Sequence, residues 1–538
     1  MAIRKLLVAN RGEIALRVFR TCRELGIATV AVAAPDDRAS LHARSADETV
    51  EIAGYLHPEE HVRAARETGA DAIHPGYGFL AESGDFADAV QAAGLTWVGP
   101  SPDALRLGAD KLAAKRLARE AGVPVLPDGP PEEVGFPLLV KAAAGGGGRG
   151  MRLVRSPGEL ADALAAAERE AVAAFGDGTL YCERYLERPR HVEVQLLGDR
   201  HGTVVALGER DCSVQRRHQK VLEEAPAPRL DAGLRAELLE AAVAFGRALR
   251  YEGAGTVEFV LEDGSFSFLE LNGRIQVEHP VTELVTGLDL VAEQLRVAAG
   301  EPLTLAPATP HGHAVEVRLY AEDPVTFLPQ AGRIERLRLP EGVRVDAGVQ
   351  EGDEVGLAYD PLIAKLVAHG RDRDEALELL ADALAETEVG GVTTNLPFLR
   401  WLVAHPRVRA GEATTALLVE HPPLSPAPLR APAGPWRSPW RLNLPAPPPA
   451  PPPALDSGAL AQSAHHGSSA VTAPMPGSVL RVEVAPGDEV AARAPLVVLE
   501  AMKMEIPVHS PFAGTVAAVH VAPGDRVAGG AVLVDLES

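Results

Sequence analysis

Five polar side chains alternate with apolar ones between Phe266 and Glu278, and their types suit phosphate and metal chemistry. They are Glu270, Asn272, Arg274, Gln276 and Glu278. On an extended backbone all five would point to one face, which is unfavourable unless that face binds something. A solvated amphipathic strand is the alternative. Glu258 lies on the preceding predicted strand, and a three-residue loop at 263–265 would place it opposite Glu270. Two carboxylates and the amide oxygen of Asn272 in this arrangement suit Mg²⁺.

A glycine-rich segment follows the strand predicted at Leu138–Lys141. Residues 145–150 contain five glycines in six positions, and glycine allows backbone N–H groups to approach phosphates closely. The segment lacks the Gly-Lys-Ser/Thr ending of a P-loop. Lys141, on the strand before the glycines, therefore indicates a lid that closes on ATP. A flexible hinge without a ligand is the alternative.

Two further polar segments favour a binding site. Residues 211–220 are dense in hydrogen-bond donors, although the segment alone would also fit a surface loop. In residues 315–320, apolar residues alternate with Glu316, Arg318 and Tyr320, so Glu316 and Arg318 share one face of a strand. From the pattern alone, Arg318 fits an ordinary surface ion pair equally well.

Lys503 stands between two methionines in a chain that has only five. It lies within a duplicated stretch, because Pro474–Glu500 matches Pro511–Glu537 at a constant offset of 37 residues. Each half reads as short strands separated by Pro-Gly-Asp turns, in which glycine supplies the positive φ. Two such units would pack as a small sandwich with quasi-twofold symmetry. The hairpin between them would present Lys503 at its tip.

The bulk composition is that of a globular protein with several domains. The chain has 538 residues, too many for one core, and 23% of them are charged. A net charge of −22 argues against nucleic acid and against an anionic membrane, since both bind basic surfaces. Cys22, Cys182 and Cys212 are too far apart for a disulfide framework or zinc site, and Cys22 is predicted to be a core residue. Apolar runs are too short for a membrane span or a signal peptide, which predicts a cytoplasmic protein.

The N-terminal third alternates strands with helices. Strands are predicted at 5–9, 29–34, 71–74 and 96–98, with a helix at Glu13–Leu25. This order is typical of a parallel sheet with right-handed crossovers. The sequence therefore predicts an α/β fold.

A proline-rich linker precedes the duplicated stretch. Residues 422–453 contain 14 prolines in 32 positions, which predicts a semi-rigid polyproline segment with a reach of roughly 100 Å over its full length. Trp436 and Trp440 lie in this segment. Because linkers seldom expose two tryptophans, we expect a docking peptide for a partner subunit there.

Several segments of the first 425 residues closely resemble biotin carboxylase, an ATP-grasp enzyme. They are Ala9–Ala15, His74–Leu80, Gly145–Met151, Asp211–Lys220 and Arg274–Glu283. The repeats that bracket Met-Lys-Met resemble biotinyl carrier domains. Lipoyl carrier domains share that fold and are the alternative. As a whole the chain resembles the alpha chains of bacterial acetyl- or propionyl-CoA carboxylases.

The resemblance implies an order of domains along the chain. It comprises an N-terminal Rossmann-like domain (1–114), an ATP-grasp domain (115–300), a biotin carboxylase C-terminal domain (301–425), the linker (426–470) and a small all-β biotinyl, or hammerhead, domain (471–538). Segments after Ile52 and between Pro127 and Val134 are shorter than in most relatives. Gly273 replaces a commoner threonine.

The resemblance also implies the residues of the site. The ATP contacts would be Lys111, Lys141, Gly146, Gly147, Gly148, Glu183, His191, Gln215 and His218. Mg²⁺ or Mn²⁺ would be held by Glu258, Glu270 and Asn272. The bicarbonate pocket would consist of Lys220, Arg274, Gln276, Val277 and Glu278. Lys220, Arg274, Glu278 and Arg318 would take part in catalysis, and Lys503 would carry biotin.

The implied reaction explains these residue types. Bicarbonate attacks the γ-phosphate of ATP to form carboxyphosphate, a step in which metal ions and lysines offset the charge of the transferring group. Glu278 would take the bicarbonate proton. Carboxyphosphate releases CO₂, and Arg318 would stabilise the oxyanion of biotin as its nitrogen attacks. Arg274, beside Glu278, would hold the anionic substrate.

The implied partners are a biotin protein ligase and a separate carboxyltransferase beta subunit, in a larger complex that contains a homo-oligomer of this chain. Pyruvate or urea carboxylase is one alternative, but residues 430–470 leave no room for a carboxyltransferase. A biotin store with an inactive ATP site and a different ATP-grasp ligase are the others. The sequence does not name the acyl-CoA.

Overall fold

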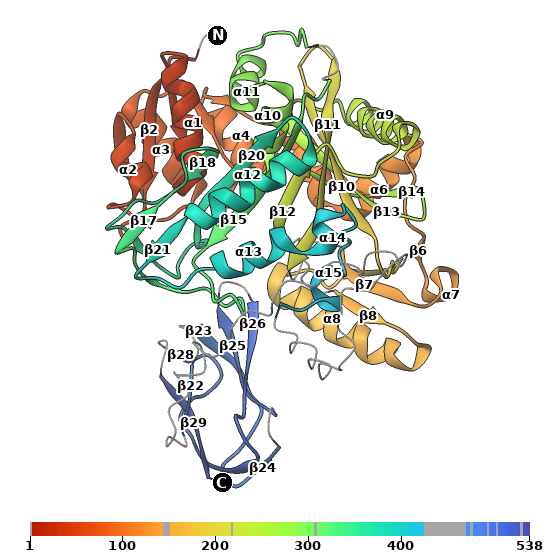
Figure 1. Ribbon diagram of the computed structural model, residues 1–538, viewed down its shortest axis with the longest axis vertical. Helices are drawn as coiled ribbons and strands as arrows, with labels where there is room; N and C mark the ends of the chain where they lie inside the picture. Colours follow the sequence, from red (N-terminus) through yellow and green to blue (C-terminus); the bar gives the residue numbers. More distant parts are fainter. Residues whose placement is uncertain are drawn as a thin grey trace, which may run out of the picture.

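The structure is a computed structural model in which the chain forms a large body and a smaller C-terminal domain (Figure 1). It describes residues 3–143, 151–216, 219–305, 309–423, 470–473, 477–491, 494–501, 504–527 and 531–537. We call residues 3–423 the body and residues 470–537 the C-terminal domain. Several predicted features lie outside the described residues: Gly146, Gly147, Gly148, His218, Lys503, and the linker segment with Trp436 and Trp440.

A five-stranded parallel sheet forms the N-terminal part of the body. Its strands pair in the order β3-β2-β1-β4-β5. They are β1 (Lys5–Val8), β2 (Ala28–Ala33), β3 (Glu48–Glu51), β4 (Ala72–His74) and β5 (Thr96–Trp97). The helices of this part are α1 (Gly12–Glu24), α2 (Leu41–Ser45), α3 (Pro58–Thr68), α4 (Gly84–Ala92) and α5 (Pro102–Ala109). Cys22 on α1 is fully buried, as predicted.

An eight-stranded antiparallel sheet is the centre of the body. Its order is β14-β13-β10-β11-β12-β15-β20-β18. The strands are β10 (Arg190–Gly198), β11 (Val204–Arg216), β12 (Gln219–Ala225), β13 (Gly253–Glu262), β14 (Ser265–Asn272), β15 (His313–Tyr320), β18 (Arg344–Ala347) and β20 (Leu362–Gly370). Because β12 pairs with β15, one sheet runs through two of the domains that the sequence suggested.

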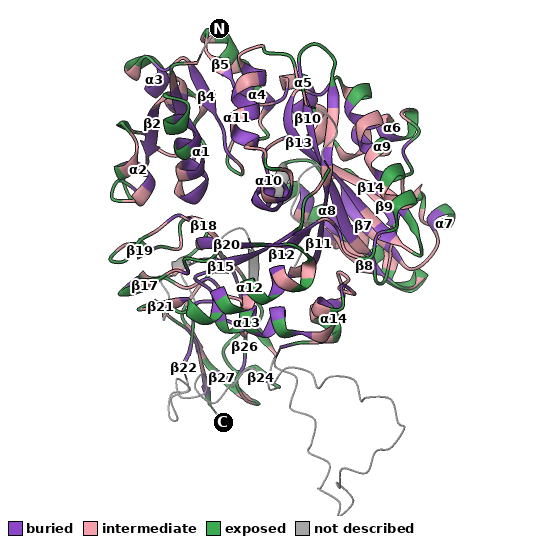
Figure 2. Ribbon diagram, turned by 45° about the horizontal axis from the view of Figure 1, so that its top comes forward, coloured by how far each residue is buried: buried purple, intermediate pink, exposed green. Residues whose placement is uncertain are grey.

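The two faces of this sheet differ in character. On one face, alternate residues such as Val192, Val194, Val257 and Phe259 pack in an apolar core with α9 (Ala232–Leu249). The residues between them on the strands are polar and point to the other face. That second face is covered in part by α10 (His279–Thr286), which packs against β11, β12, β15 and β20. Figure 2 shows most of the sheet as buried. A buried polar face therefore lies under α10.

Smaller elements complete the body. The remaining helices are α6 (Lys111–Glu120), α7 (Pro131–Val134), η1 (Pro157–Glu159), α8 (Leu160–Phe175), α11 (Leu290–Ala298), α12 (Arg373–Glu386), α13 (Leu396–Ala404), α14 (Pro406–Arg409) and α15 (Leu417–Glu420). One small sheet contains β6 (Asp128–Gly129), β9 (Leu180–Arg184), β7 (Leu138–Ala142) and β8 (Arg152–Val154). Two strand pairs are β16 (Gly332–Arg333) with β19 (Glu354–Val355), and β17 (Arg336–Arg338) with β21 (Glu388–Gly390).

The C-terminal domain consists of two four-stranded sheets around a shared apolar core. One sheet contains β22 (Ala470–Thr472), β29 (Val532–Glu537), β27 (Gly514–Val519) and β24 (Glu489–Val490). The other contains β26 (Met504–His509), β25 (Pro495–Ala501), β23 (Gly477–Val482) and β28 (Arg526–Val527). Ala501 pairs with Met504, so the predicted hairpin between the repeats is present.

The predicted α/β fold with an all-β C-terminal domain is confirmed. One local prediction was wrong, because β14 ends at Asn272 and the extended strand does not continue to Glu278. Residues 273–278 instead form a bent segment that leads into α10, with Glu278 at the N-cap position. Within the described ranges, no helix has both the length and the apolar character needed to cross a membrane.

Candidate active site

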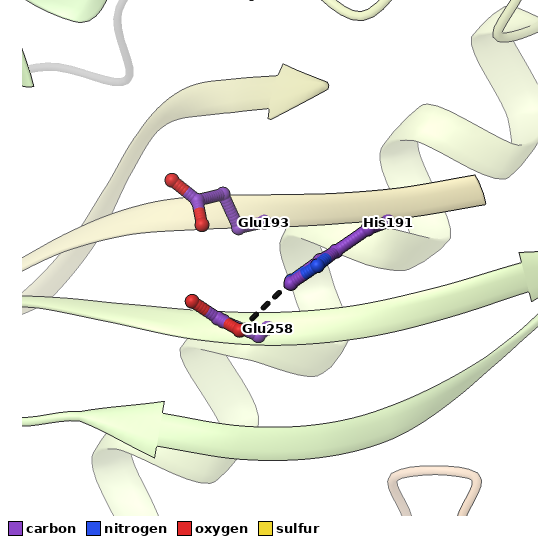
Figure 3. Close-up of side chains that lie close together, drawn as sticks. All are labelled: His191, Glu193 and Glu258. Atoms are coloured by element: carbon purple, nitrogen blue, oxygen red, sulfur yellow. Dashed lines mark ion pairs between the residues drawn. The ribbon is translucent and has the colours of Figure 1, made fainter. Parts of the chain in front are cut away.

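Three buried side chains on adjacent strands mark the polar face of the large sheet. His191 and Glu193 project from β10 and Glu258 projects from β13, all toward one side (Figure 3). The Nε2 atom of His191 lies 2.8 Å from a carboxylate oxygen of Glu258. Burial alone would lower the pKa of His191, but the charge of Glu258 raises it overall. Glu258 therefore favours the cationic form of the imidazole.

Lys220, on β12, joins this group to the rest of the site. Its ammonium nitrogen lies 2.7 Å from Glu258 and 2.7 Å from Glu278, and it also forms an ion pair with Glu193. Burial would lower the pKa of Lys220, but the three carboxylates together raise it well above its ordinary value. Because Lys220 stays charged, it binds three carboxylates that would otherwise repel one another.

Glu278 lies between two cations. On one side is Lys220, and on the other the guanidinium of Arg318 donates to its carboxylate at 3.0 Å. Burial would raise the pKa of Glu278, but Lys220 and Arg318 hold it well below its usual range. Glu278 is therefore ionised and available as a proton acceptor. Arg318 is buried and also pairs with Glu223 on β12, so it is not the surface ion pair that the pattern alone permitted.

The bent segment after β14 contains the remaining predicted bicarbonate residues, of which Gln276 contacts Glu258. The guanidinium of Arg274 donates to the amide oxygens of Asn272 and Gln276, at 3.0 and 3.1 Å. Gln276 in turn donates to Glu258 at 3.3 Å. The carbonyl oxygen of Val277 accepts a hydrogen bond of 2.9 Å from Lys365 on β20.

A pair of opposing carboxylates fits the predicted cation site. Glu258 and Glu270 are directly opposite on β13 and β14, as predicted. The connection differs from the expected three-residue loop, since a two-residue turn at Asp263-Gly264 and a bulge beside Glu258 produce the same pairing. Burial and the charge of Glu258 raise the pKa of Glu270. A divalent cation would relieve this repulsion, and the oxygen ligands are those that Mg²⁺ prefers.

A second set of side chains with metal-ligating atoms is His191, Glu193 and Glu258, whose ligand atoms lie within 4.8 Å of one another. We favour the Glu258–Glu270 pair because its carboxylate oxygens are the ligands that Mg²⁺ prefers, whereas an imidazole nitrogen suits transition metals better. Asn272 supplies an amide to the same place, and its side chain donates to Glu258 at 2.8 Å.

The predicted ATP residues form a lysine group at the small sheet. Lys141 on β7 forms an ion pair with the buried Glu183 of β9. Lys115 on α6 pairs with the same carboxylate. Burial would raise the pKa of Glu183, but both lysines lower it. Lys111 begins α6, and burial lowers its pKa. Two lysines that share one carboxylate leave positive charge for phosphate groups.

Gln215, another predicted ATP residue, lies beside His191. Its side chain contacts His191 and donates to the backbone carbonyl of Cys212 at 2.8 Å. Cys212 itself is fully buried, and burial raises the pKa of its thiol well above the ordinary value. A protonated, buried thiol is no nucleophile.

Two buried carboxyl groups lie behind Arg318. Glu223 on β12 is directly opposite Glu316 on β15, and both are fully buried. Burial raises the pKa of Glu223 to about 7 and that of Glu316 well above its ordinary value. Neither oxygen of Glu316 has a hydrogen-bond partner among the described residues. The pair therefore retains at least one proton near neutral pH.

Sequence reasoning missed several of these residues, namely Lys115, Glu193, Arg210 and Glu223. Each lies on a segment that the sequence analysis did not examine. One signal was present, because His191, Glu193 and Gln195 alternate with valines on β10 in the same way as the polar residues of β14. Arg210 is completely buried and forms a 2.6 Å ion pair with Glu193.

Family models match most of the chain. Residues 2–105 match "Biotin carboxylase, N-terminal domain" and residues 110–306 match "Carbamoyl-phosphate synthase L chain, ATP binding domain". Residues 316–420 match "Biotin carboxylase C-terminal domain", and residues 469–536 match "Biotin-requiring enzyme". ATP and covalent biotin, the expected cofactors, are those of the matched domains.

Two relatives illustrate the sequence similarity. The alpha subunit of mitochondrial methylcrotonoyl-CoA carboxylase from Arabidopsis thaliana is 49% identical over 445 residues, covering 78% of this chain and 61% of the relative. Biotin carboxylase from Halalkalibacterium halodurans is 46% identical over 441 residues, covering 78% of this chain and 98% of the relative. The chain thus spans about three fifths of the first relative and nearly all of the second.

Solved structures with the same fold include two that hold nucleotides. A biotin carboxylase complex from Campylobacter jejuni has a TM-score of 0.76 at 40% identity, with coverage of 78% of this chain and 99% of the other. The biotin carboxylase domain dimer of Hydrogenobacter thermophilus 2-oxoglutarate carboxylase, in complex with MgADP, ADP and bicarbonate, has a TM-score of 0.76 at 43% identity. It covers 78% of this chain and 98% of the other.

Proposed function

The chain belongs to the biotin carboxylase family, and we propose that it carboxylates biotin carried on its own C-terminal domain. ATP and bicarbonate are the substrates, and Lys503 is the attachment point. The observation that supports this most strongly is the position of Glu278, ionised between Lys220 and Arg318 on a buried polar face. A carboxylate base that lies between two cationic side chains suits an anionic oxygen substrate such as bicarbonate.

The bicarbonate step uses this arrangement directly. The guanidinium of Arg274 and the ammonium of Lys220 bind the anion, and Glu278 accepts its proton as it attacks the γ-phosphate. With its pKa held low by Lys220 and Arg318, Glu278 is a weak base, so the transfer becomes favourable as the attack makes the bicarbonate proton more acidic. A general base of this kind contributes about 10²- to 10⁴-fold to the rate.

The neighbouring residues bind the nucleotide and the cation. Lys111, Lys141 and Glu183 contact ATP, together with His191, Gln215, His218 and the Gly146–Gly148 segment. Glu258, Glu270 and Asn272 would hold Mg²⁺, which supplies charge neutralisation for phosphoryl transfer when bound. The raised pKa of Glu270 beside Glu258 supports this assignment.

Transfer to biotin depends on Arg318. A C–O bond of carboxyphosphate breaks to give CO₂ and phosphate, the phosphate takes the ureido N–H proton of biotin, and the ureido nitrogen forms its bond to CO₂. Arg318 neutralises the negative charge that develops on the ureido oxygen, as a buried donor fixed between Glu223 and Glu278. One donor of this kind contributes about 3 to 4 kcal/mol to the stability of a transition state.

We further propose that the chain is the alpha subunit of an acyl-CoA carboxylase with a separate carboxyltransferase beta subunit. Acetyl- or propionyl-CoA is the predicted acceptor, and methylcrotonoyl-CoA is the second candidate because relatives of that name match 78% of the chain. A biotin protein ligase would modify Lys503. The Hydrogenobacter dimer supports a homo-oligomer, and the cytoplasmic location stays a prediction, since both bacterial and mitochondrial relatives match.

ATP hydrolysis tests this proposal. The purified chain should hydrolyse ATP only with bicarbonate and Mg²⁺, and free biotin should raise the rate. Absence of this activity would favour a biotin store with an inactive ATP site. Biotinylated chain should also carboxylate itself, whereas the Lys503→Arg variant should lose this reaction and keep its activity on free biotin. Carboxylation of some other acceptor by that variant would identify a different ATP-grasp ligase.

Co-purification identifies the acceptor. The partner that purifies with the chain is combined with it and offered acetyl-, propionyl- and methylcrotonoyl-CoA, with ADP release as the readout. A preference of at least about tenfold for one thioester names the substrate, since tenfold corresponds to about 1.4 kcal/mol of discrimination. If a carboxyltransferase partner turned over none of the three, the acyl-CoA assignment would be wrong.

A further inference from the structure

Two leucines of the body pack against the apolar core of the C-terminal domain. They are Leu328 and Leu357, both partly buried. Leu328 lies in the loop between β15 and β16, and Leu357 lies in the loop between β19 and β20. Figures 1 and 2 both place β26 of the C-terminal domain next to the body, with the C-terminus on the far side. We call Leu328 and Leu357 the docking patch.

The docking patch adjoins the strand that holds Arg318. β15 ends two residues beyond Arg318, at Tyr320. The next residue, Ala321, donates its backbone N–H to the carbonyl of Pro361 at 2.9 Å, which joins the two leucine loops. Arg216 holds the first loop as well, because it donates to the carbonyl of Phe327 at 2.9 Å. Both leucines are therefore on loops attached to the Arg318 side of the site.

We infer that Leu328 and Leu357 form the surface on which the C-terminal domain sits while its biotin is loaded. This inference rests on the proposed function, because it concerns delivery of biotin to the same site. The occupant is the chain's own C-terminal domain, whose apolar core extends to the two leucines. In the sequence Lys503 lies between β25 and β26, which are paired neighbours in one sheet of that domain.

The small size of the patch suits a carrier. A domain that must leave for a second active site needs a contact that forms and breaks readily. Two leucines make such a contact, since burial of each one shifts an equilibrium by about 10- to 100-fold. The linker raises the local concentration of the domain to about the mM range when its length fits the span, so a weak surface is sufficient.

A double variant of the full-length, biotinylated chain tests the inference. Leu328→Ser with Leu357→Ser should lower the rate at which the chain carboxylates its own biotin by at least about tenfold. The kcat/KM for free biotin should stay unchanged, because neither leucine is one of the proposed catalytic residues. The matched control is Leu56→Ser with Leu379→Ser, which changes two leucines that are 56% and 36% exposed elsewhere on the body.

The outcomes separate the inference from the proposed function. An unchanged rate on the chain's own biotin overturns the docking patch. An equal loss on free and attached biotin also overturns it, since the leucines would then act on the site itself. The conservative pair Leu328→Met with Leu357→Met should restore the rate, and failure to do so counts against an apolar contact. A parent chain inactive on free biotin would instead refute the proposed function.

Discussion

The body and the C-terminal domain bury different kinds of side chain. In the body, the buried groups include many charges, among them Lys115, Glu183, Glu193, Arg210, Glu223, Glu258, Glu278, Glu316, Arg318 and Lys365. In the described part of the C-terminal domain, Ser510 is the only buried polar residue. The body thus holds fixed charges on a buried sheet face. The C-terminal domain instead has two sheets packed around an aliphatic core.

This difference predicts different consequences of mutation. Buried charges contribute little net stability, because loss of solvation offsets their mutual attraction. They do place preorganised charge around a reacting group. Substitutions at the charged face should therefore change the rate most strongly, whereas substitutions in the aliphatic core of the C-terminal domain should change folding and leave the chemistry of the body intact.

The largest expected effect is at Glu278. Glu278→Gln removes the proton acceptor and leaves a side chain of similar size. Bicarbonate-dependent ATP hydrolysis should fall about 10²- to 10⁴-fold, on free biotin and on the attached biotin alike. A steady-state measurement of kcat with saturating ATP checks this. Near-normal turnover in the variant would show that the base has been wrongly assigned.

Glu224 provides the matched control for Glu278. Glu224 is also buried, but it lies on the opposite face of β12. There it pairs with Arg373 and, at 2.8 Å, with His313. Glu224→Gln should lower the thermal midpoint of the body, since it leaves Arg373 without a full partner. Its kcat should stay within about twofold of the parent, because Glu224 faces away from the site. A large loss of kcat in the Glu224→Gln variant would contradict the prediction that only one face of β12 affects the reaction rate.

A core substitution tests the other half of the comparison. Leu533 on β29 is fully buried in the C-terminal domain, and Leu533→Ala should destabilise that domain by about 2–5 kcal/mol. Hydrogen exchange of β27 and β29 in the full chain should accelerate, while activity on free biotin stays constant. Val532→Ala is the control, because Val532 is 41% exposed on the same strand. Loss of free-biotin activity in the Leu533 variant would contradict the separation of roles.

The sequence predicted the strands of the site better than their assembly. The alternation of Glu270 and Asn272 with apolar residues correctly indicated one strand face. The predicted pairing of Glu258 with Glu270 is present, but a two-residue turn and a bulge produce it in place of the expected three-residue loop. The prediction failed beyond Asn272, where the chain bends so that Glu278 begins α10. Alternation alone does not reveal where extended backbone ends.

The partners of the catalytic residues depended on tertiary structure. Lys220 meets Glu193 only because β11 and β12 fold back across β10. Arg318 meets Glu223 only because β15 joins β12 in one sheet across a predicted domain boundary. No local pattern encodes the strand order of such a sheet. The sequence could therefore propose candidate site residues, but not which of them are neighbours.

The last prediction concerns Glu316, behind Arg318, and the size of its effect depends on pH. Its raised pKa means that the folded chain keeps a proton that the unfolded chain releases above about pH 4.5. The free energy of unfolding therefore falls as pH rises, by about 1.4 kcal/mol per pH unit between the two pKa values. Glu316→Gln removes this titration and leaves a neutral side chain of similar size.

Glu316→Gln should therefore stabilise the body at pH 8 and have little effect at pH 5, as measured by thermal unfolding across that range. Glu223, with its pKa raised to about 7, contributes a slope of the same sign in both proteins, so the slope should shrink without vanishing. The exposed Glu378→Gln on α12 is the control and should shift no curve. A variant less stable than the parent at pH 8 would mean that Glu316 is ionised in the folded chain, and that the charged face of the body stabilises the fold after all.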